Sequence, residues 1–361
     1  MRSRNGHRGA ISMVPCERVT AITPHGHPPS GFSEPYLPCM FRDLTAADIS
    51  AAADRLAGIC ARTPLRRSGP LTGIAGADVW LKLECAQVTG SFKLRGAYNT
   101  VATMPLELRE RGIVTASAGN HGLGCAWAAR ALGMAAVVCV PSTAPDVKKR
   151  GIRALGATVD DSSRDYDAAH ELALKQATLT GAVFVSPTNG NALYAGQGTV
   201  AKEILDERSD IETIVVPVGG GGLTGGVGRY AKETKPSIRV IGVQTDTTDA
   251  MARSVAARRI VEIEVPPTLA DGLAGQIDEH GLEVGLAVID DIAIVTEAEL
   301  GDTIAWLWRT EGIKVEGAGA VGVAAIRFGR IAKPAGPIAV IVTGGNIDDD
   351  THAELLRRFP G

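Results

Sequence analysis

The stretch Thr89–Ala97 (TGSFKLRGA) decides how the rest of the chain is interpreted. It follows an apolar run at 79–83 that predicts a strand, and it opens a helical pattern, so Lys93 is expected in the first turn of a helix. An amine there meets the positive end of the helix dipole and is partly desolvated by Phe92 and Leu94, and both effects lower its pKa. A lysine with a lowered pKa can form a Schiff base with a carbonyl compound. Taken alone, the stretch is better explained as an ordinary helix start with a solvated lysine.

Length and composition limit the class of protein. At 361 residues the chain can form two domains, each with its own core. Aromatic residues make up only 4% and the net charge is −3, which argues against a nucleic-acid or anionic-membrane partner. No apolar run approaches the roughly 18 residues that cross a membrane. The six cysteines are scattered without a C-x-x-C pair, as is typical of free thiols, so a soluble cytoplasmic protein is expected.

The order of apolar segments predicts the fold class. Residues 1–40 are rich in Gly, Pro, His and Arg and predict a disordered extension. From residue 78 onward, apolar runs alternate with helical patterns, which predicts an α/β fold with parallel sheets and helices on both faces. Ligands of such folds bind beyond the carboxyl ends of strands, where every motif below lies. The expected strands are 79–83, 113–116, 136–140, 157–159, 183–185, 214–218, 240–243 and 338–342, and the expected helices include 45–58, 122–132, 145–155, 166–179 and 196–205.

A second motif, Ser117–Gly122 (SAGNHG), lies between a predicted strand and a predicted helix. Small residues and glycine at a helix N-terminus expose backbone N–H groups that bind a carboxylate or phosphate. Asn120 adds an amide that can donate or accept. The alternative is an ordinary strand-to-helix turn, with His121 as a structural histidine. The residues expected to bind a substrate carboxylate are Ser117, Ala118, Gly119, Asn120 and His121.

The third motif, Gly219–Gly225 (GGGGLTG), directly follows a predicted buried strand. Four consecutive glycines are costly in chain entropy, which disfavours a purely structural reason for them. Successive amides and a helix dipole form a phosphate-binding loop. The pattern also satisfies the dinucleotide fingerprint G-x-G-x-x-G, but that site requires an acidic residue at the end of the next strand, where this chain has Gln244. Dinucleotide binding is therefore the weaker interpretation.

The fourth motif, Thr343–Asn346 (TGGN), presents a hydroxyl at the end of the last strong strand. Alone it predicts no more than a turn. A Schiff-base lysine, a phosphate-binding loop, an anion-binding turn and a strand-end hydroxyl are together the parts that hold pyridoxal 5′-phosphate (PLP) and an amino acid. The motifs therefore predict that Lys93 binds the aldehyde of PLP and that the glycines bind its phosphate.

These motifs resemble those of the fold type II PLP-dependent enzymes, specifically the serine/threonine dehydratase (threonine ammonia-lyase) family. The resemblance covers the chain from about residue 63 to its C-terminus. It rests on four motifs in the family's order: S-F-K-x-R-G-A at 91–97, S-x-G-N-H at 117–121, the tetraglycine at 219–222 and T-G-G-N at 343–346.

The resemblance implies an α/β fold of two parallel-sheet domains, of the tryptophan synthase β-like type. Residues 41–105 and 191–361 would form a large PLP-binding domain, and residues 106–190 a small domain inserted in it. Enzymes of this type are often dimers or tetramers, so a homodimer or homotetramer is expected.

The family's motifs also imply roles for single residues. Lys93 carries the Schiff base and acts as acid and base at the substrate Cα. Asn120 hydrogen-bonds the 3′-oxygen of PLP, and Thr343 faces the pyridine nitrogen. A hydroxyl there, unlike a carboxylate, need not protonate that nitrogen, which suits β-elimination more than transamination. The implied cofactor-binding residues are Phe92, Lys93, Asn120, Gly219, Gly220, Gly221, Gly222, Leu223, Glu316 and Thr343.

Departures from the pattern narrow the function. Serine racemases of this fold have a serine as second base where this chain has Ala118, so racemisation is not expected as the main activity. The metal site of those relatives needs a glutamate and an aspartate where this chain has Gln244 and Ala250, so no metal is expected there. Most dehydratases of the family have serine at the position of Thr343, which leaves the natural substrate open.

The resulting hypothesis is a PLP-dependent ammonia-lyase of the EC 4.3.1 class. It would eliminate water from a 3-hydroxy amino acid, L-threonine or L-serine in the first place, to give a 2-keto acid and ammonia. Alternatives are a dehydratase for a rarer substrate (hydroxyaspartate, phenylserine or a catabolic intermediate), a serine racemase or a β-replacement enzyme. The alternative from another class is a dinucleotide-binding protein, which has no need of Lys93 opposite its phosphate loop.

Overall fold

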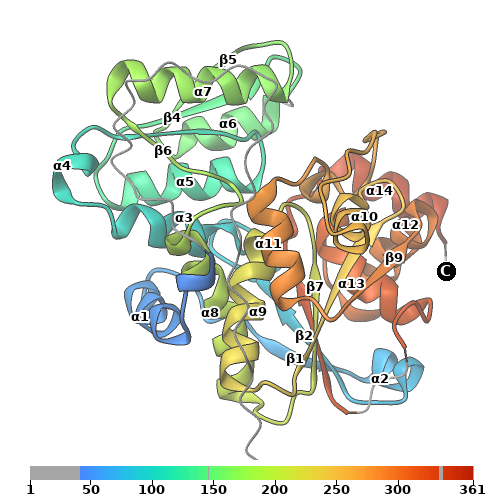
Figure 1. The fold of residues 1–361 in the computed structure, drawn as a ribbon. Helices are drawn as coiled ribbons and strands as arrows, with labels where there is room; N and C mark the ends of the chain where they lie inside the picture. Colours follow the sequence, from blue (N-terminus) through green and yellow to red (C-terminus); the bar gives the residue numbers. More distant parts are fainter. Residues whose placement is uncertain (1–40, 145, 333–335, 361) are drawn as a thin grey trace, which may run out of the picture. The chain divides into compact units, whose positions relative to one another are not determined.

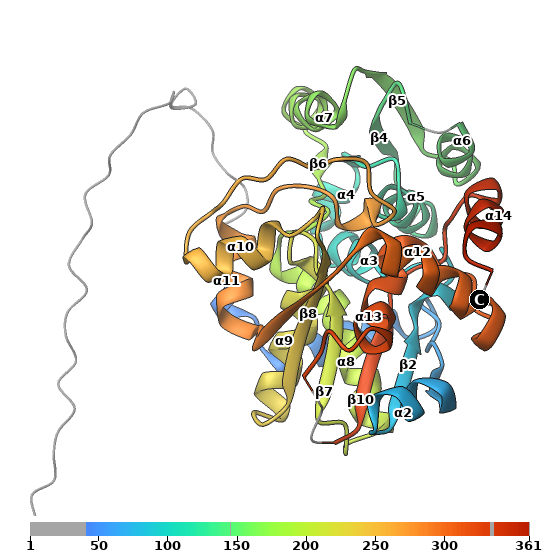
Figure 2. The same ribbon diagram turned by 90° about the vertical axis from the view of Figure 1, so that its right-hand side faces the viewer.

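The larger of two sheets combines strands from both ends of the described chain. A computed structural model describes residues 41–144, 146–332 and 336–360. Six strands are ordered β1-β2-β10-β7-β8-β9, and all neighbours are parallel except β1 and β2 (Figure 1). The last strand, β10, therefore lies between β2 and β7, as Figure 2 shows. The strands are β1 (Leu65–Ser68), β2 (Val79–Leu83), β7 (Thr213–Pro217), β8 (Arg239–Thr245), β9 (Asp291–Val295) and β10 (Ile338–Val342).

The smaller sheet is built from the middle of the chain. Its four strands are ordered β5-β4-β3-β6 and are all parallel. Two mainly parallel sheets confirm the predicted α/β fold class. The domain boundaries at 106 and 190 stay a prediction. The strands are β3 (Ile113–Ala116), β4 (Ala136–Pro141), β5 (Thr158–Ser163) and β6 (Val183–Phe184).

Helices fill most of the connections between strands. The helix expected at 196–205 begins at Asn191, five residues before the predicted start. Gly196, which suggested a helix start, lies inside this helix. A glycine is needed there because α3 approaches closely: a Cβ atom at Gly196 would lie 2.4 Å from the Arg95 carbonyl oxygen. Strands β1 and β9 were not predicted: β1 (LRRS) lacks an apolar pattern, whereas the apolar run of β9 (DIAIV) was overlooked. The helices are α1 (Ala46–Leu56), α2 (Gly69–Ala75), α3 (Lys93–Ala102), α4 (Leu106–Arg109), α5 (Asn120–Ala131), α6 (Asp146–Ala154), α7 (Tyr166–Thr180), α8 (Asn191–Glu207), α9 (Gly222–Thr234), α10 (Ala250–Ala257), α11 (Glu279–Val288), α12 (Glu297–Trp306), α13 (Gly317–Arg327) and α14 (Asp349–Arg358), with short helical turns η1 (Phe41–Asp43), η2 (Glu84–Ala86), η3 (Asp271–Leu273) and η4 (Leu307–Glu311).

The central strand β10 separates two hydrophobic cores. Its side chains alternate between the faces of the sheet, as those of any strand do. Val340 packs with residues of α12 and α13 in one core, and Ile341 packs with residues of α1, α8 and α9 in the other. Both faces are thus covered by helices, which explains why all five residues of β10 are buried.

Helix α3 joins the two sheets. It follows β2 of the larger sheet, but Leu94 and Val101 pack in a core with Val138 of the smaller sheet and with Cys125 of α5. The first residue of α3, Lys93, therefore lies where the larger sheet meets the elements of the smaller one. This position explains how one side chain can be reached from loops of both sheets.

The structure bears on two predictions, the absence of a membrane-spanning segment and the presence of free thiols. None of the helices in the described ranges is both long and apolar enough to span a membrane. The four cysteines within these ranges are free thiols, as expected. The disordered extension predicted for residues 1–40 lies outside the described residues.

Candidate active site

The backbone around Lys93 is held by the loop that follows β10. The Phe92 N–H donates to the Thr343 carbonyl at 3.1 Å, and Ser91 forms an isolated antiparallel bridge with Gly344. The Gly345 N–H donates to the Gly90 carbonyl at 3.0 Å. The first and fourth predicted motifs, which are about 250 residues apart in the sequence, are therefore neighbours in space.

The Lys93 amine has the properties expected of a reactive lysine. Its Nζ donates to the Pro187 carbonyl at 2.9 Å and lies 5.4 Å from the centre of the Phe92 ring. Desolvation by burial lowers the pKa of Lys93 to about 8, although the nearby Cys125 and Glu316 act in the opposite direction. A substantial fraction of the amine is then neutral near physiological pH, and the neutral form is the nucleophile.

The glycine loop borders the same segment that holds Lys93. A Cβ atom at Gly220 would lie 2.6 Å from Thr188 Cγ2, and one at Gly222 would lie 3.1 Å from the Thr188 carbonyl oxygen. Thr188 follows Pro187, the acceptor for Lys93. Gly221 has φ +97°, in the left-handed region that favours glycine, and it caps α9 without a side-chain hydrogen bond from the described residues. The first-turn N–H groups of α9 are thus available to an anion, in agreement with the predicted phosphate loop.

The second motif begins α5 and contributes backbone groups. Helix α5 starts at Asn120, and the preceding Gly119 faces open space, since a Cβ atom there would meet no atom within 4 Å. The His121 ring is turned into the protein, with Nε2 3.2 Å from the Val185 carbonyl oxygen and 3.4 Å from Cys125 Sγ. Burial, with a smaller effect of Lys93, lowers the pKa of His121 to about 3, so the ring is neutral. For His121 this favours the structural alternative, and the helix start offers N–H groups to a carboxylate.

Asn120 and Glu316, both predicted to lie near the cofactor, are in direct contact. Asn120 Nδ2 donates to Glu316 Oε1 at 2.7 Å. Burial of Glu316, together with the nearby Asp271, raises the pKa of this carboxyl to about 7. Asn346 Nδ2 donates to Asn120 Oδ1 at 2.7 Å. Asn346 belongs to the predicted motif at 343–346, but no role was predicted for its side chain.

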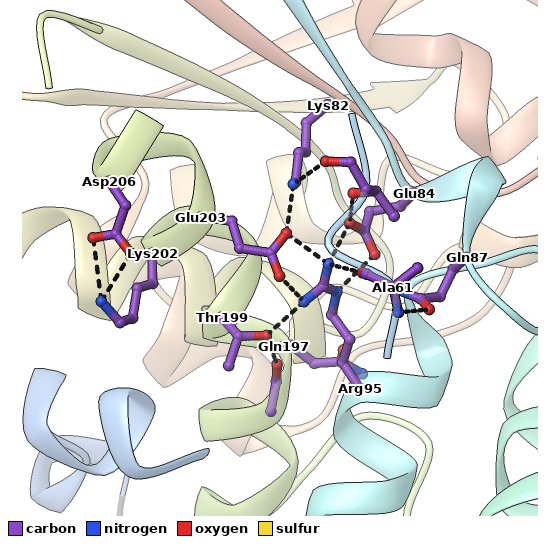
Figure 3. Close-up of polar contacts among 12 residues, drawn as sticks. Ala61, Lys82, Glu84, Gln87, Arg95, Gln197, Thr199, Lys202, Glu203 and Asp206 are labelled. Atoms are coloured by element: carbon purple, nitrogen blue, oxygen red, sulfur yellow. Dashed lines mark hydrogen bonds and ion pairs between the residues drawn. The ribbon is translucent and has the colours of Figure 1, made fainter. Parts of the chain in front are cut away.

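A buried ionic network lies along α3 next to the site (Figure 3). Arg95 is 1% exposed, and its Nε and Nη2 donate to the Glu84 carboxylate at 2.8 Å each. Its Nη1 and Nη2 also donate to Glu203 of α8, at 2.7 and 2.9 Å. Lys82 Nζ lies 2.5 Å from Glu203, and the Thr63 hydroxyl donates to Glu84. The network joins the first turns of α3 to β2, η2 and α8, and it was not predicted from the sequence.

Gln244, which stands where the related metal site needs a glutamate, uses its side chain for hydrogen bonds to the backbone. Gln244 Nε2 donates to the carbonyls of Val218 and Thr248, at 3.1 and 2.6 Å, and Oε1 accepts from the Ala252 N–H. Within the described ranges, His, Cys, Asp and Glu side chains form no group of three or more that could hold a metal ion. The expectation of no metal stays a prediction.

Comparison with known proteins assigns the family. A sequence model of the family described as "Pyridoxal-phosphate dependent enzyme" matches residues 56–344. The chain belongs to this family. The predicted cofactor and the predicted family resemblance are thereby confirmed, and dinucleotide binding is disfavoured.

Relatives of this PLP-dependent enzyme include lyases and racemases. An L-threonine ammonia-lyase of Thermotoga maritima is 42% identical over 318 residues, which cover 87% of this chain and 79% of the relative. The structure of maize serine racemase has a TM-score of 0.83 at 32% identity and covers 87% of this chain and 97% of that one. Threonine deaminase isoform 2 from Solanum lycopersicum has a TM-score of 0.79 at 30% identity and covers 86% and 91%.

The residues of the site fit PLP. An amine of lowered pKa matches the aldehyde of PLP. A helix N-terminus without a side-chain cap, preceded by Gly220, which has no room for a side chain, and by Gly221, whose φ favours glycine, matches its phosphate. Lys93 would hold the aldehyde, Gly219–Gly222 with Leu223 the phosphate, and Asn120 the 3′-oxygen. Thr343 is buried beside Phe92 and would face the pyridine nitrogen.

The lowered pKa of Lys93 predicts how cofactor binding depends on pH. Because the neutral amine attacks an aldehyde, the rate of PLP binding to the apoprotein is expected to rise with pH and to level off above about 8. The Glu316 carboxylate favours the ammonium form of Lys93, so Glu316→Gln should move the midpoint to lower pH. Stopped-flow absorbance across neutral and alkaline pH measures both midpoints. A rate that still rises toward the ordinary lysine pKa of 10.5 would contradict the prediction.

Proposed function

We propose that this PLP-dependent enzyme is an ammonia-lyase that acts on a 3-hydroxy amino acid, with L-threonine or L-serine as the first candidates. It removes water and then ammonia, and it leaves a 2-keto acid. The observation that carries the proposal is the Lys93 amine, with a pKa lowered to about 8, next to the segment that borders the glycine loop. The 42% identity to a threonine ammonia-lyase supports this substrate class.

The residues of the chain divide the work between binding and proton transfer. PLP, when bound, supplies an electron sink for the carbanion formed at the substrate Cα. The N–H groups at the start of α5 bind the substrate carboxylate and so orient the amino acid. Lys93 Nζ removes the proton from Cα. The hydroxyl on Cβ takes up one proton and leaves as water, so that the Cβ–O bond breaks as the Cα–Cβ double bond forms. Hydrolysis of the resulting enamine releases the 2-keto acid and ammonia, so that water is lost once and taken up once.

Glu316 is placed to respond to charge around the cofactor. Its carboxyl has a pKa raised to about 7 and contacts the Asn120 amide. A group that titrates near the working pH can hold or release a proton at low cost. We propose that Glu316 takes up or releases a proton as the charge near the cofactor changes, and that it thereby sets the charge next to the Asn120 amide.

The side chains expected near the substrate Cα and the cofactor distinguish the main proposal from other substrates and reactions. Ala118 offers no proton for a second face of Cα, which disfavours racemisation, although maize serine racemase shares the fold. A dehydratase for hydroxyaspartate, phenylserine or a catabolic intermediate remains the second candidate, because Thr343 stands where most dehydratases have serine. A homodimer or homotetramer located in the cytoplasm is also proposed, in line with enzymes of this type.

The proposal is tested by measuring products from a panel of amino acids. The purified enzyme, saturated with PLP, is mixed with L-threonine, L-serine, their D-isomers, 3-hydroxyaspartate and 3-phenylserine. We expect equal amounts of ammonia and 2-keto acid, with the highest kcat/KM for L-threonine or L-serine. Faster conversion of L-serine to D-serine than to ammonia would replace the proposal by a racemase. A PLP-bound enzyme that releases no ammonia from any of these substrates would refute it.

A further inference from the structure

Asn346 connects three of the predicted motifs through one side-chain amide. Its Nδ2 donates to the Thr89 carbonyl at 2.9 Å and to Asn120 Oδ1 at 2.7 Å. Thr89 is the first residue of the lysine-bearing stretch, and Asn120 begins α5. Asn346 itself ends the turn that follows β10. One amide group therefore joins the loop after β2, the start of α5 and the end of the central strand.

These contacts fix which way the Asn120 amide points. A side-chain amide accepts at its oxygen and donates at its nitrogen. Because both bonds of Asn346 Nδ2 are donated, Asn120 turns its oxygen toward Asn346 and its nitrogen toward Glu316. The opposite orientation would bring two NH₂ groups together and turn the Asn120 oxygen to a carboxylate. Both changes leave polar groups without partners, which is costly.

The neighbouring backbone keeps Asn346 in this position. Gly90 has φ +74°, and a Cβ atom there would lie 2.3 Å from Asn346 Oδ1. The Gly345 N–H donates to the Gly90 carbonyl at 3.0 Å. Glycine at position 90 is thus required both by the backbone conformation and by the close approach of the asparagine.

We propose that Asn346 is a positioning residue for Asn120: it sets the donor edge of the Asn120 amide toward Glu316 and the cofactor. The inference rests on the cofactor-binding role proposed for Asn120. It adds that this role depends on Asn346 of the fourth motif, which orients the Asn120 amide. Asn346 does not itself need to touch PLP. Its removal should act on the cofactor only as long as Asn120 is present.

A double-mutant cycle on cofactor affinity tests this dependence. We expect Asn346→Ala to weaken PLP binding by the apoprotein about tenfold, the effect of losing one well-placed hydrogen bond. In the Asn120→Ala background the same substitution should change the dissociation constant less than about twofold. Gln176→Ala, which removes an amide hydrogen bond to Asp160 in the smaller sheet, is the matched control and should leave PLP affinity unchanged.

A second variant separates orientation from packing. Asn346→Asp keeps the size of the side chain but replaces the donor by an acceptor, so the Asn120 amide should turn over and present its oxygen to Glu316. PLP affinity should then fall at least as far as in Asn346→Ala, and the absorbance of bound PLP should change with pH around a higher midpoint, because Glu316 loses a donor. A role in packing alone predicts the reverse order, with the isosteric aspartate milder than alanine.

Two results would overturn the proposal. One is an unchanged PLP affinity in Asn346→Ala, and the other is an equal loss of affinity with and without the Asn120 side chain. The melting temperature of each apoprotein shows whether a variant is folded. If Asn346→Ala does not fold, Asn346→Asp takes its place in the double-mutant cycle. Because no substrate is involved, an enzyme that releases no ammonia from any amino acid of the panel would refute the proposed reaction and leave this test intact.

Discussion

Replacing Lys93 by alanine is expected to remove the visible absorbance of bound PLP and to lower ammonia-lyase activity about a thousandfold or more. The side chain supplies both the nucleophile for the aldehyde and the base at the substrate Cα, and no other amine is seen to donate to the Pro187 carbonyl in the described residues. Absorbance of the purified protein and coupled assay of the 2-keto acid measure the two effects.

The loss should come without a loss of stability. Burial lowers the pKa of Lys93 below the ordinary value of 10.5, so the native state disfavours the ammonium that the unfolded chain carries at neutral pH. The apoprotein of Lys93→Ala is therefore expected to melt no lower than the wild-type apoprotein. Lys93→Arg keeps the charge but lacks a neutral nucleophile and should be equally inactive.

Lys175→Ala provides the matched control for these variants. Lys175 lies exposed on α7, away from the described site, and its replacement should leave absorbance and activity unchanged. A Lys93→Ala protein that keeps the visible band and turns over L-threonine at more than a small fraction of the wild-type rate would refute the assigned role.

The parts of the site that could be predicted from the sequence are contiguous in it. The Lys93 stretch and the glycine loop each combine a strand, a turn and a helix start within about ten residues, so their geometry follows from local rules. The prediction that Lys93 occupies the first turn of a helix is confirmed, since α3 begins at Lys93. Strands β3 and β10 have the predicted bounds because their apolar runs are bordered by polar residues and turns.

The parts that could not be predicted depend on contacts between distant residues. The sequence contains no pattern that pairs Asn346 with Asn120, because a single polar side chain has no periodicity. The neutral state of the His121 ring likewise follows from its burial and from the nearby Lys93, and both arise only in the folded chain. Local motifs thus predict where chemistry occurs, while tertiary contacts decide how each side chain is turned.

The buried network of Arg95 gives the second prediction, on stability. Arg95→Met is expected to lower the free energy of unfolding of the apoprotein by about 3–5 kcal/mol, because it leaves the fully buried Glu84 carboxylate without its partner. Burial alone would raise the pKa of Glu84, but the ion pair and hydrogen bonds with Arg95 outweigh burial and hold that pKa below its ordinary value. The network therefore stabilises the native state above the unfolded pKa of about 4.5, and this contribution is lost as pH falls through the lower native pKa.

Urea unfolding of paired variants distinguishes a buried charge from a missing side chain. Arg67→Met breaks the exposed ion pair with Asp78 and should cost less than about 1 kcal/mol. Adding Glu84→Gln to Arg95→Met should restore part of the loss, since the neutral amide needs no counter-charge. Equal losses in Arg95→Met and Arg67→Met, or no recovery in the double variant, would contradict the prediction. Recovery would show that most of the loss in Arg95→Met comes from the charge of the Glu84 carboxylate, which Arg95 compensates in the network that joins the first turns of α3 to η2 and α8.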